Sequence, residues 1–417
     1  MKAGDTMVIG IIGAGASGMA AALAASENEN VQVILWERQA RVGRKLAATG
    51  NGRCNLTNMN AHAFPYMIGQ GHGYYHGTDP AFVRDALLHY SPDETLQWFR
   101  RMGLYTVKEE SGRVYPYSDQ ANSVVDVLRF ALDKPNIQLL CGREVKKVVR
   151  KDGQFLVTDG EETIRCDKLI VACGGIAGSK LGGTMSGYQL LRSMGHHCTR
   201  LRPSLVQLKS NWHGCAALKG VRANCHVMIL HNGELFAESE GEIQVTEYGL
   251  SGPVIFEVSR DVCGEKGEWV CRLNLLPGYY DEDLEYELMR RKASNLLSDE
   301  LLTGILHNRL GRVISKEAGV KSGIPIKDIP DAVLREVARL VKEFDIQVTE
   351  PMGMDSAQVT AGGILTSEFY PETMESKLVP GLYACGEVLD IDGACGGYNL
   401  QWAWSSGRLA GESAGKE

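Results

Sequence analysis

The sequence lacks several patterns that would assign it to a common functional class. No two of its 11 cysteines have the C-x-x-C spacing of a zinc ribbon or a thioredoxin-like redox pair. It also lacks an excess of basic residues, because 44 Lys and Arg stand against 51 Asp and Glu, a formal net charge of −7. This balance provides no overall field that would attract nucleic acid or anionic lipid.

A long, strongly apolar run is missing as well. Residues 7–26 carry no charge, but they are mostly Ala and Gly, whereas a membrane span needs about 20 strongly apolar residues. Asp5 stands where a signal peptide would be basic, although Ala22-Leu23-Ala24 resembles a cleavage site. Because the scattered thiols fit a reducing compartment, we expect a cytoplasmic protein with no membrane partner.

The composition is that of a globular protein. Of the 417 residues, 44% are hydrophobic and 23% are charged. At about 150 residues per domain, this length predicts two or three domains. Glycine is in excess, with 48 residues, against an average usage of about 7%. The excess predicts tight turns and places where the backbone approaches a ligand closely.

The first 40 residues have the pattern of a dinucleotide-binding βαβ unit. The β-branched run 7–12 predicts a buried strand, and Gly13-Ala-Gly-Ala-Ser-Gly18 follows it directly. In order, the three glycines of this motif permit a tight turn, close approach of the backbone to a pyrophosphate, and close packing of the next helix. A second strand at 31–36 precedes Glu37, the position from which a carboxylate binds a ribose hydroxyl.

The loop after this unit favours FAD over a nicotinamide dinucleotide. Residues 42–55, V-G-R-K-L-A-A-T-G-N-G-R-C-N, are polar and glycine-rich where an NAD-binding domain would have a plain helix. The long ribityl and isoalloxazine arm of FAD needs such a second contact segment. In this loop the chain resembles the BaiN-like family of FAD-dependent oxidoreductases, which are described as NAD(P)/FAD-dependent flavoproteins.

Three later segments resemble the same family. Residues 169–175 resemble the strand and Gly-Gly turn that return the chain to the cofactor, with Cys173 where the family more often has Thr. Residues 242–259, containing Y-G-L-S-G-P, resemble its mid-chain signature, and residues 357–411 contain T-A-G-G-I, G-L-Y-A-C-G-E and G-G-Y-N. The resemblance spans nearly the whole chain and departs from the family pattern at 176–185.

The C-terminal segment also has a physical interpretation of its own. Residues 382–385 predict a short strand, after which the Glu387 carboxylate would reach ribityl hydroxyls or groups near the pyrophosphate. Gly396 and Gly397 precede a helix predicted to start at Tyr398. If its N-terminus points at the pyrimidine edge of the flavin, that helix stabilises the negative charge that reduction places there.

Taken together, the motifs and the resemblance predict a set of FAD-binding residues. The set comprises Gly13, Gly15, Ala16, Ser17, Gly18, Glu37, Arg38, Arg44, Lys45, Leu46, Gly50, Asn51, Arg53, Cys54, Val145, Ala172, Gly174, Gly386, Glu387, Gly396, Gly397, Tyr398, Asn399 and Leu400.

The resemblance and the periodicity predict an α/β fold. A Rossmann-type FAD-binding domain of the glutathione-reductase-like kind is interrupted by a β-barrel-like module that carries a helical insertion. Alternation of apolar and polar residues predicts the β module, and a helical period follows it. We expect FAD-domain segments at 1–198 and 357–417, the β module at 199–278, the helical insertion at 279–346 and a return strand at 347–356.

Two absences constrain the source of electrons. No second G-x-G-x-x-G follows a strand, and no C-x-x-x-x-C lies beside the flavin loop. A second Rossmann domain for a tightly held nicotinamide and a disulfide reductase are therefore both disfavoured. Electrons would come from transient NADH or NADPH, from another carrier, or from the substrate itself.

The resemblance implies a function. The family is credited with reducing carbon–carbon double bonds of 3-oxo-4,6-unsaturated bile acids, which predicts NAD(P)H-dependent reduction of such a bile acid or steroid enone. Relatives oxidise aminoacetone, so an amine oxidase that produces hydrogen peroxide is the alternative. A flavin-binding RNA-associated or regulatory protein is a third, but the acidic charge and the lack of an Arg- and aromatic-rich patch argue against RNA. We expect a small-molecule substrate and no nucleic acid; the oligomeric state stays open.

Three residues in these segments are candidates for catalysis. Tyr398 could donate a proton to the carbanion formed after hydride transfer, or it could simply order its loop. Cys54 could be a flavin-adjacent thiol, although packing is the simpler explanation, and Arg53 precedes it. His196-His197 and the stretch 71–76 contain paired histidines without a third ligand at suitable spacing, so we expect no metal.

Overall fold

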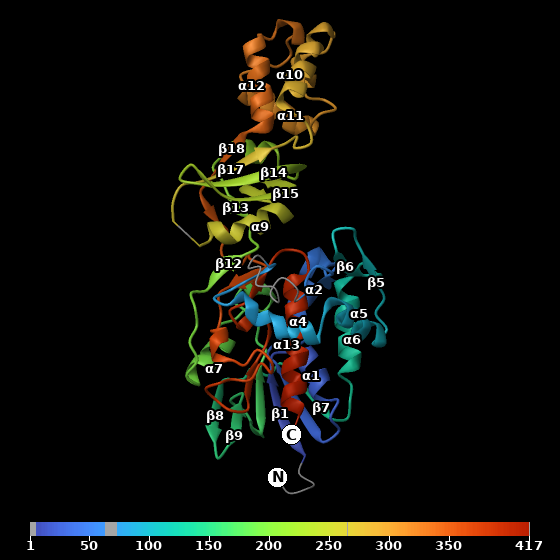
Figure 1. Ribbon diagram of the computed structural model, residues 1–417, viewed down its shortest axis with the longest axis vertical. Helices are drawn as coiled ribbons and strands as arrows, with labels where there is room; N and C mark the ends of the chain where they lie inside the picture. The colour runs from blue at the N-terminus through green and yellow to red at the C-terminus, as the bar shows by residue number, and fades with distance from the viewer. Residues whose placement is uncertain (1–5, 63–72, 265, 417) are drawn as a thin grey trace. The chain divides into compact units, whose positions relative to one another are not determined.

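The computed structural model describes residues 6–62, 73–264 and 266–416. It divides into two compact units, one formed by residues 1–202 and 358–417 and the other by residues 203–357 (Figure 1). The boundaries fall at 202/203 and 357/358, where the sequence placed them at 198/199 and 356/357. Each unit has its own hydrophobic core.

A five-stranded parallel sheet forms the centre of the first unit. Its strand order is β21-β11-β1-β2-β7, with β1 at Met7–Ile12, β2 at Val31–Glu37, β7 at Ile137–Cys141, β11 at Lys168–Val171 and β21 at Leu382–Ala384. Ile11 lies between Leu35 and Ile170 in the register, and all three side chains are buried. Short, largely apolar runs form most of these strands, as is typical of a parallel sheet that is buried on both faces.

Helices α1 (Ala16–Ala25) and α13 (Tyr398–Gly415) lie side by side in this unit (Figure 1). Both are built largely from small residues, which lets their backbones approach closely. The other α-helices in the described part of this unit are α2 (Arg44–Ala47), α4 (Arg84–His89), α5 (Pro92–Arg101), α6 (Ala121–Ala131) and α7 (Ser186–Ser193).

Smaller sheets surround the parallel sheet. One is a meander of β8 (Lys147–Lys151), β9 (Gln154–Thr158) and β10 (Thr163–Cys166). Its first turn is an Asp-Gly pair, with left-handed φ angles of 51° at Asp152 and 82° at Gly153. A second sheet joins β3 (Thr57–Asn58), β6 (Arg113–Pro116) and β5 (Thr106–Lys108), and a third joins β4 (Tyr75–His76) to β22 (Asp392–Gly393).

The second unit is built on a seven-stranded antiparallel sheet with the order β18-β17-β14-β15-β16-β13-β19. One chain segment forms both ends of this order, because β18 (Phe344–Val348) pairs with β17 and β19 (Glu350–Pro351) pairs with β13. That continuity closes the sheet in a barrel-like manner. The remaining strands are β13 (Leu208–Lys209), β14 (Arg222–His231), β15 (Glu234–Thr246), β16 (Gly249–Ser251) and β17 (Trp269–Asn274).

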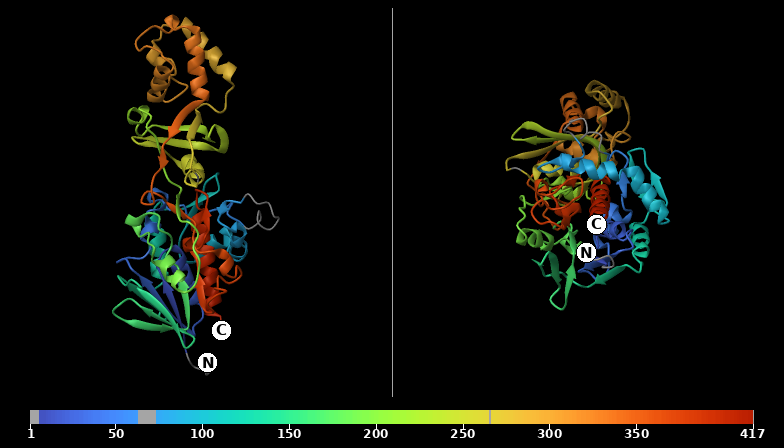
Figure 2. Two further views of the ribbon diagram at one scale, coloured as in Figure 1. Left: turned by 90° about the vertical axis from the view of Figure 1, so that its left-hand side faces the viewer. Right: turned by 60° about the horizontal axis from the view of Figure 1, so that its bottom comes forward.

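Helices complete the second unit. The expected helical segment contains α10 (Asp281–Arg290), α11 (Asn308–Glu317) and α12 (Asp331–Lys342), which gather at one end of the unit (Figures 1 and 2). Helix α9 (Pro253–Val262) packs against β15, and α8 (Gly214–Ala217) is a single turn. Strands β12 (Arg202–Ser204) and β20 (Val359–Ala361) lie where the chain passes from one unit to the other. In the described ranges, no helix has the length and apolar character that a membrane span requires.

Candidate cofactor and active site

The turn between β1 and α1 has the geometry of a phosphate-binding loop. Gly13 has a left-handed φ of 104°, and a Cβ atom at Gly18 would lie 1.8 Å from the Gly13 carbonyl oxygen. Both positions therefore require glycine. At Gly15, by contrast, a Cβ would meet no described atom within 4 Å. The backbone is open at the one glycine that the motif assigns to pyrophosphate.

Helices α1 and α13 run parallel, and their N-termini point the same way. Gly407 faces Ser17, Gly411 faces Ala21 and Gly415 faces Ala25. Residue numbers therefore increase in the same direction along both helices. By this register α13 extends eight residues beyond the start of α1, which is about 12 Å at 1.5 Å per residue. Among the described residues, neither helix has a side-chain cap or an acidic residue in its first turn. The two uncapped N-termini are offset along one direction. The N-terminus of α1 fits the phosphates, and that of α13 fits the flavin ring at the other end of the ribityl arm.

Glu37, at the end of β2, lies beside the turn between β1 and α1. The Glu37 carboxylate accepts hydrogen bonds from the backbone amides of Ala14, at 3.0 Å, and Gln39, at 2.8 Å. It is therefore held beside the glycine motif at the end of β2. Arg38 donates to the Gly182 carbonyl and Arg44 to the Gln39 side chain, so these two predicted FAD-binding residues engage protein groups.

The loop after α2 contains four residues with left-handed backbone conformations. They are Gly50, Asn51, Gly52 and Cys54. Asn51 is exposed, whereas Cys54 is fully buried. Burial raises the pKa of the Cys54 thiol to about 12, so the thiol is neutral near pH 7 and packs as a small apolar group.

Arg53 lies at the surface of this loop. Its guanidinium pairs with Asp119 at 2.5 Å and Glu109 at 3.5 Å, and it lies 4.1 Å from the centre of the Tyr115 ring. With 43% of its side chain exposed, Arg53 is neutralised by two carboxylates. We therefore assign it to holding the loop against the sheet of β3, β6 and β5.

Glu387, in the C-terminal segment, meets Lys45 of α2 close to the glycine loop between β1 and α1. Lys45 and Glu387 form an ion pair at 2.9 Å, and the second Glu387 oxygen accepts the Thr360 amide at 2.8 Å. A Cβ at Gly386 would lie 2.6 Å from Ser17 Oγ, and one at Gly13 would lie 2.6 Å from the Ala172 carbonyl. Two of the three later segments that resemble the family, 169–175 and 357–411, therefore contact the first turn of α1 or the glycine loop.

The N-terminus of α13 is enclosed by the β3 segment. A Cβ at Gly397 would lie 2.5 Å from the Thr57 carbonyl, and Asn58 donates from Nδ2 to the Gly396 carbonyl at 2.9 Å. Asn399 holds the preceding loop through hydrogen bonds to the backbone of Gly393 in both directions. These contacts fix the direction of the helix start.

Tyr398, the first residue of α13, is buried in a cluster of tyrosines. Its ring stacks on Tyr74, with 4.4 Å between centroids and 24° between planes, and Tyr75 meets it edge-on. The Tyr75 hydroxyl donates to the Tyr398 carbonyl at 3.0 Å. Only 4% of Tyr398 is exposed, because Tyr74, itself 42% exposed, covers it.

The other predicted residues complete this picture. Leu46, Val145 and Ala172 are buried, Ala16, Gly174 and Leu400 are half-buried, and Gly50 is exposed. Sequence reasoning missed Arg113, Asn55 and Thr360 as individual site residues. The T-A-G-G-I motif offered a signal for Thr360, but no motif or periodicity pointed to Arg113.

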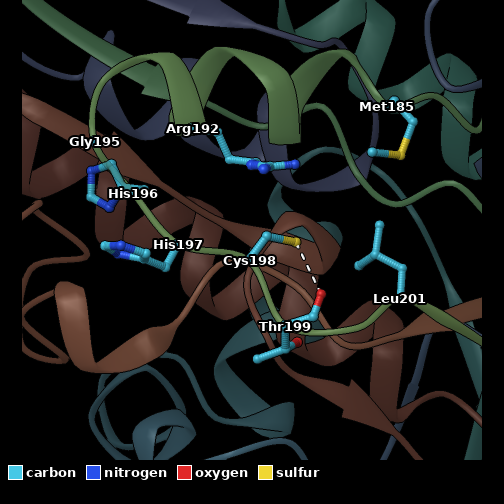
Figure 3. A pocket seen from close by; sticks show the side chains of 8 residues that line it. All are labelled: Met185, Arg192, Gly195, His196, His197, Cys198, Thr199 and Leu201. Atoms are coloured by element: carbon cyan, nitrogen blue, oxygen red, sulfur yellow. Dashed lines mark hydrogen bonds between the residues drawn. The ribbon is translucent and has the colours of Figure 1, made fainter.

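The histidine pair belongs to a different feature of the first unit. A cavity of about 590 Å³ lies between α7 and residues 195–201 (Figure 3), and no predicted site residue lines it. Glu368 binds both histidines there, at 3.0 Å from His196 Nδ1 and 2.6 Å from His197 Nδ1, and Ser376 binds His196 Nε2. Burial lowers the pKa of His196, which favours its neutral form.

These contacts give the pair a structural role. Within the described ranges no group of three or more His, Cys, Asp or Glu could hold a metal ion. In the second histidine stretch, His72 lies outside the described residues.

Comparisons with known proteins place the chain in a family. The model of the HI0933-like protein Rossmann domain matches residues 7–413. A 3-dehydro-bile acid delta(4,6)-reductase from Clostridium scindens is 38% identical, over 97% of this chain and 98% of that protein. A ribosomal RNA dihydrouridine synthase from Escherichia coli is 30% identical, over 95% of each chain.

A solved structure shares the fold. A 3-ketosteroid delta1-dehydrogenase from Sterolibacterium denitrificans superposes with a TM-score of 0.54 and 12% identity, over 98% of this chain and 99% of that one. The predicted α/β Rossmann-type fold and the predicted family resemblance are both confirmed. This chain belongs to the HI0933-like family, and it is an FAD-binding oxidoreductase of the Rossmann type.

Proposed function

We propose that this protein reduces a carbon–carbon double bond conjugated to a carbonyl group, as in a 3-oxo-4,6-unsaturated bile acid or steroid, with FAD as cofactor. The observation that carries the proposal is the 38% identity, over nearly the whole of both chains, to a 3-dehydro-bile acid delta(4,6)-reductase. Dihydrouridine is uridine with a saturated ring double bond beside a carbonyl group. The name of the second relative therefore describes the same class of reaction.

The site supports binding of FAD in a defined direction. We assign the open backbone at Gly15 and the N-terminus of α1 to the pyrophosphate, and Glu37 to the ribose. We assign the N-terminus of α13, about 12 Å further along the same direction, to the flavin ring. The ion pair of Lys45 with Glu387 lies beside the first turn of α1 and would contact the linking arm.

Reduction of an enone requires a hydride at one carbon and a proton at the next. Bound FAD supplies the hydride chemistry, and the protein has to supply the proton. We assign the proton to the Tyr398 hydroxyl, because Tyr398 begins the helix whose N-terminus we assign to the flavin. Tyr74 and Tyr75 hold its ring in place.

Electrons enter from NADH or NADPH, which we propose binds transiently. The sequence has no second G-x-G-x-x-G after a strand, so a permanently bound nicotinamide is not expected. Bound FAD would carry two electrons from the nicotinamide to the enone. The reaction is therefore balanced by one NAD(P)H and one proton per double bond.

The experiment that tests this proposal is an anaerobic titration of the purified flavoprotein. NADH, NADPH and aminoacetone are added separately while the visible absorbance of the flavin is followed. We expect bleaching by a nicotinamide and recovery of the colour on addition of a 3-oxo-4,6-diene steroid, whose product gains the mass of two hydrogens. A uridine-containing ribosomal RNA serves as a second acceptor.

Each other result rejects a part of the proposal. Bleaching by aminoacetone alone, with peroxide formed on readmission of air, would replace the reductase by an amine oxidase. Recovery of colour with the RNA and not with the steroid would keep the reaction class and reject the steroid. A protein that cannot be reconstituted with FAD would reject the flavoenzyme itself.

A further inference from the structure

Arg113 lies at the start of α13, although nothing in the sequence marks it. It is the first residue of β6, whose pairing with β3 places it opposite Asn58. A Cβ at Gly396 would lie 2.9 Å from Arg113 Nε and 3.6 Å from its Cζ. Only a glycine at 396, with its left-handed φ of 114°, lets the guanidinium lie this close to the helix start.

The guanidinium of Arg113 has no carboxylate partner within the described ranges of the chain. Among the described residues, the Arg113 side chain has neither an ion pair nor a hydrogen bond. Its neighbour Arg53 differs, since Asp119 and Glu109 both pair with it. Glu109 lies in the β5–β6 turn, where its backbone amide donates to the Arg113 carbonyl at 2.8 Å, and its carboxylate pairs with Arg53 at 3.5 Å.

The position of Arg113 is unfavourable unless an anion joins it. A helix N-terminus carries a partial positive charge, so anions stabilise it and cations do not. The first turn of α13 contains no acidic residue, and the described chain provides no side-chain cap. Two positive features therefore lie together, in a half-buried environment where Coulomb interactions are stronger than in water.

A buried orphan atom lies at the same place. Asn55 Oδ1 is buried and has no hydrogen-bond partner among the described residues, and it lies 2.9 Å from the Cβ position of Gly397. A buried acceptor without a donor costs free energy. An N–H group of a ligand at the start of α13 would satisfy it. The flavin pyrimidine ring has one N–H and two carbonyl oxygens, which match Asn55 and Arg113 respectively.

We propose that Arg113 stabilises the negative charge that reduction places on the pyrimidine half of bound FAD, and thereby raises its reduction potential. The inference rests on the proposed function, since it uses the FAD site at α13. Hydride transfer from NAD(P)H delivers two electrons and one proton, so the flavin becomes an anion unless it takes a second proton. A fixed guanidinium beside the helix N-terminus favours that anion.

The test measures the flavin and not turnover. Sulfite adds reversibly to oxidised flavin and leaves the ring negatively charged, so its dissociation constant reports the positive charge near the pyrimidine. Sulfite binding and the midpoint potential are measured on FAD-loaded wild type, R113M, R113Q and R113K. R129M is the control, because Arg129 is an exposed α6 residue paired with Asp126.

We expect the two neutral variants to bind sulfite at least tenfold more weakly, as for loss of a charged hydrogen-bonding group. A tenfold change in the equilibrium constant for flavin reduction corresponds to about 30 mV in the two-electron midpoint potential. R113K should lie between the neutral variants and wild type, and R129M should equal wild type. R113Q keeps the test valid if R113M does not fold.

Wild-type sulfite affinity in a flavin-loaded neutral variant would overturn the inference and leave the proposed function intact. A variant in which only the KM for an acidic steroid changes would also overturn the inference, because Arg113 would then bind the substrate. A wild-type protein that binds no FAD overturns both, which separates failure of the cofactor assignment from failure of the role of Arg113.

Discussion

Gly407 of α13 lies directly against the backbone of Ser17 in α1, because a Cβ atom there would be 2.3 Å from the Ser17 carbonyl oxygen. The same relationship recurs one turn later, at 2.2 Å between Gly411 and Ala21, and loosens to 3.3 Å between Gly415 and Ala25. This close contact aligns the two helices whose N-termini we assign to the two ends of bound FAD.

Alanine substitutions along α13 should therefore have graded effects. Within a helix, Gly→Ala is favourable by up to about 1 kcal/mol in propensity. At Gly407 and Gly411 the methyl group would push the helices apart, and we expect a net loss of about 1–3 kcal/mol in the free energy of unfolding. Gly415→Ala is the matched control and should be neutral. Urea unfolding measures the differences; equal stability of all three variants would contradict the packing argument.

The ion pair of Lys45 with Glu387 should be coupled to FAD retention. Glu387→Gln keeps the size of the side chain but releases Lys45, and Lys45→Met removes the cation from the same contact. Because the pair is 31% and 20% exposed, its coupling energy should be modest, about 0.5–1 kcal/mol. A double-mutant cycle on the FAD dissociation constant measures it. Strictly additive effects would show that the two residues act on FAD independently.

The sequence predicts the framework of this site better than its internal contacts. Strand 7–12 and the helix from Tyr398 follow from local patterns, since β-branched runs and glycine caps act over a few residues. Lys45 and Glu387 are both predicted to bind FAD, yet they lie 342 positions apart, and no local signal pairs them. The role proposed for Arg113 depends on its contact with Gly396, and no local pattern in the sequence predicts that contact.

Buried thiols should make the protein less stable in alkaline solution. Burial raises the pKa of Cys54, Cys166, Cys225 and Cys385 from an ordinary 9.0 to about 12. Between these values the unfolded chain loses thiol protons that the folded chain keeps, so the free energy of unfolding falls as pH rises. Each thiol contributes up to about 1.4 kcal/mol per pH unit.

Urea titrations at about pH 8, below the ordinary thiol pKa, and at about pH 10, between the ordinary and the raised values, measure the effect. Cys225→Ala should reduce the pH dependence relative to wild type, whereas Cys141→Ser, at an exposed position, should change it less. The difference between variant and wild type cancels the titration of lysines. An unchanged slope in Cys225→Ala would show that its thiol ionises in the folded protein.

Tyr398→Phe separates the chemical role of this residue from its structural role. Phenylalanine keeps the stack on Tyr74 and the contact with Tyr75 but removes the hydroxyl. If that hydroxyl donates the proton, reoxidation of reduced flavin by the enone should slow by about 10²–10⁴-fold. Flavin reduction by NAD(P)H, which needs no such proton, should keep its wild-type rate.

Stopped-flow measurement of the two half-reactions distinguishes these cases. Tyr74→Phe is the matched control, because it removes a hydroxyl from the other ring of the same stack. If Tyr398→Phe reoxidises at the wild-type rate, the proton comes from another group and Tyr398 serves only to fix the start of α13. Equal slowing of both half-reactions would indicate a displaced flavin, because a proton donor acts in one half-reaction only.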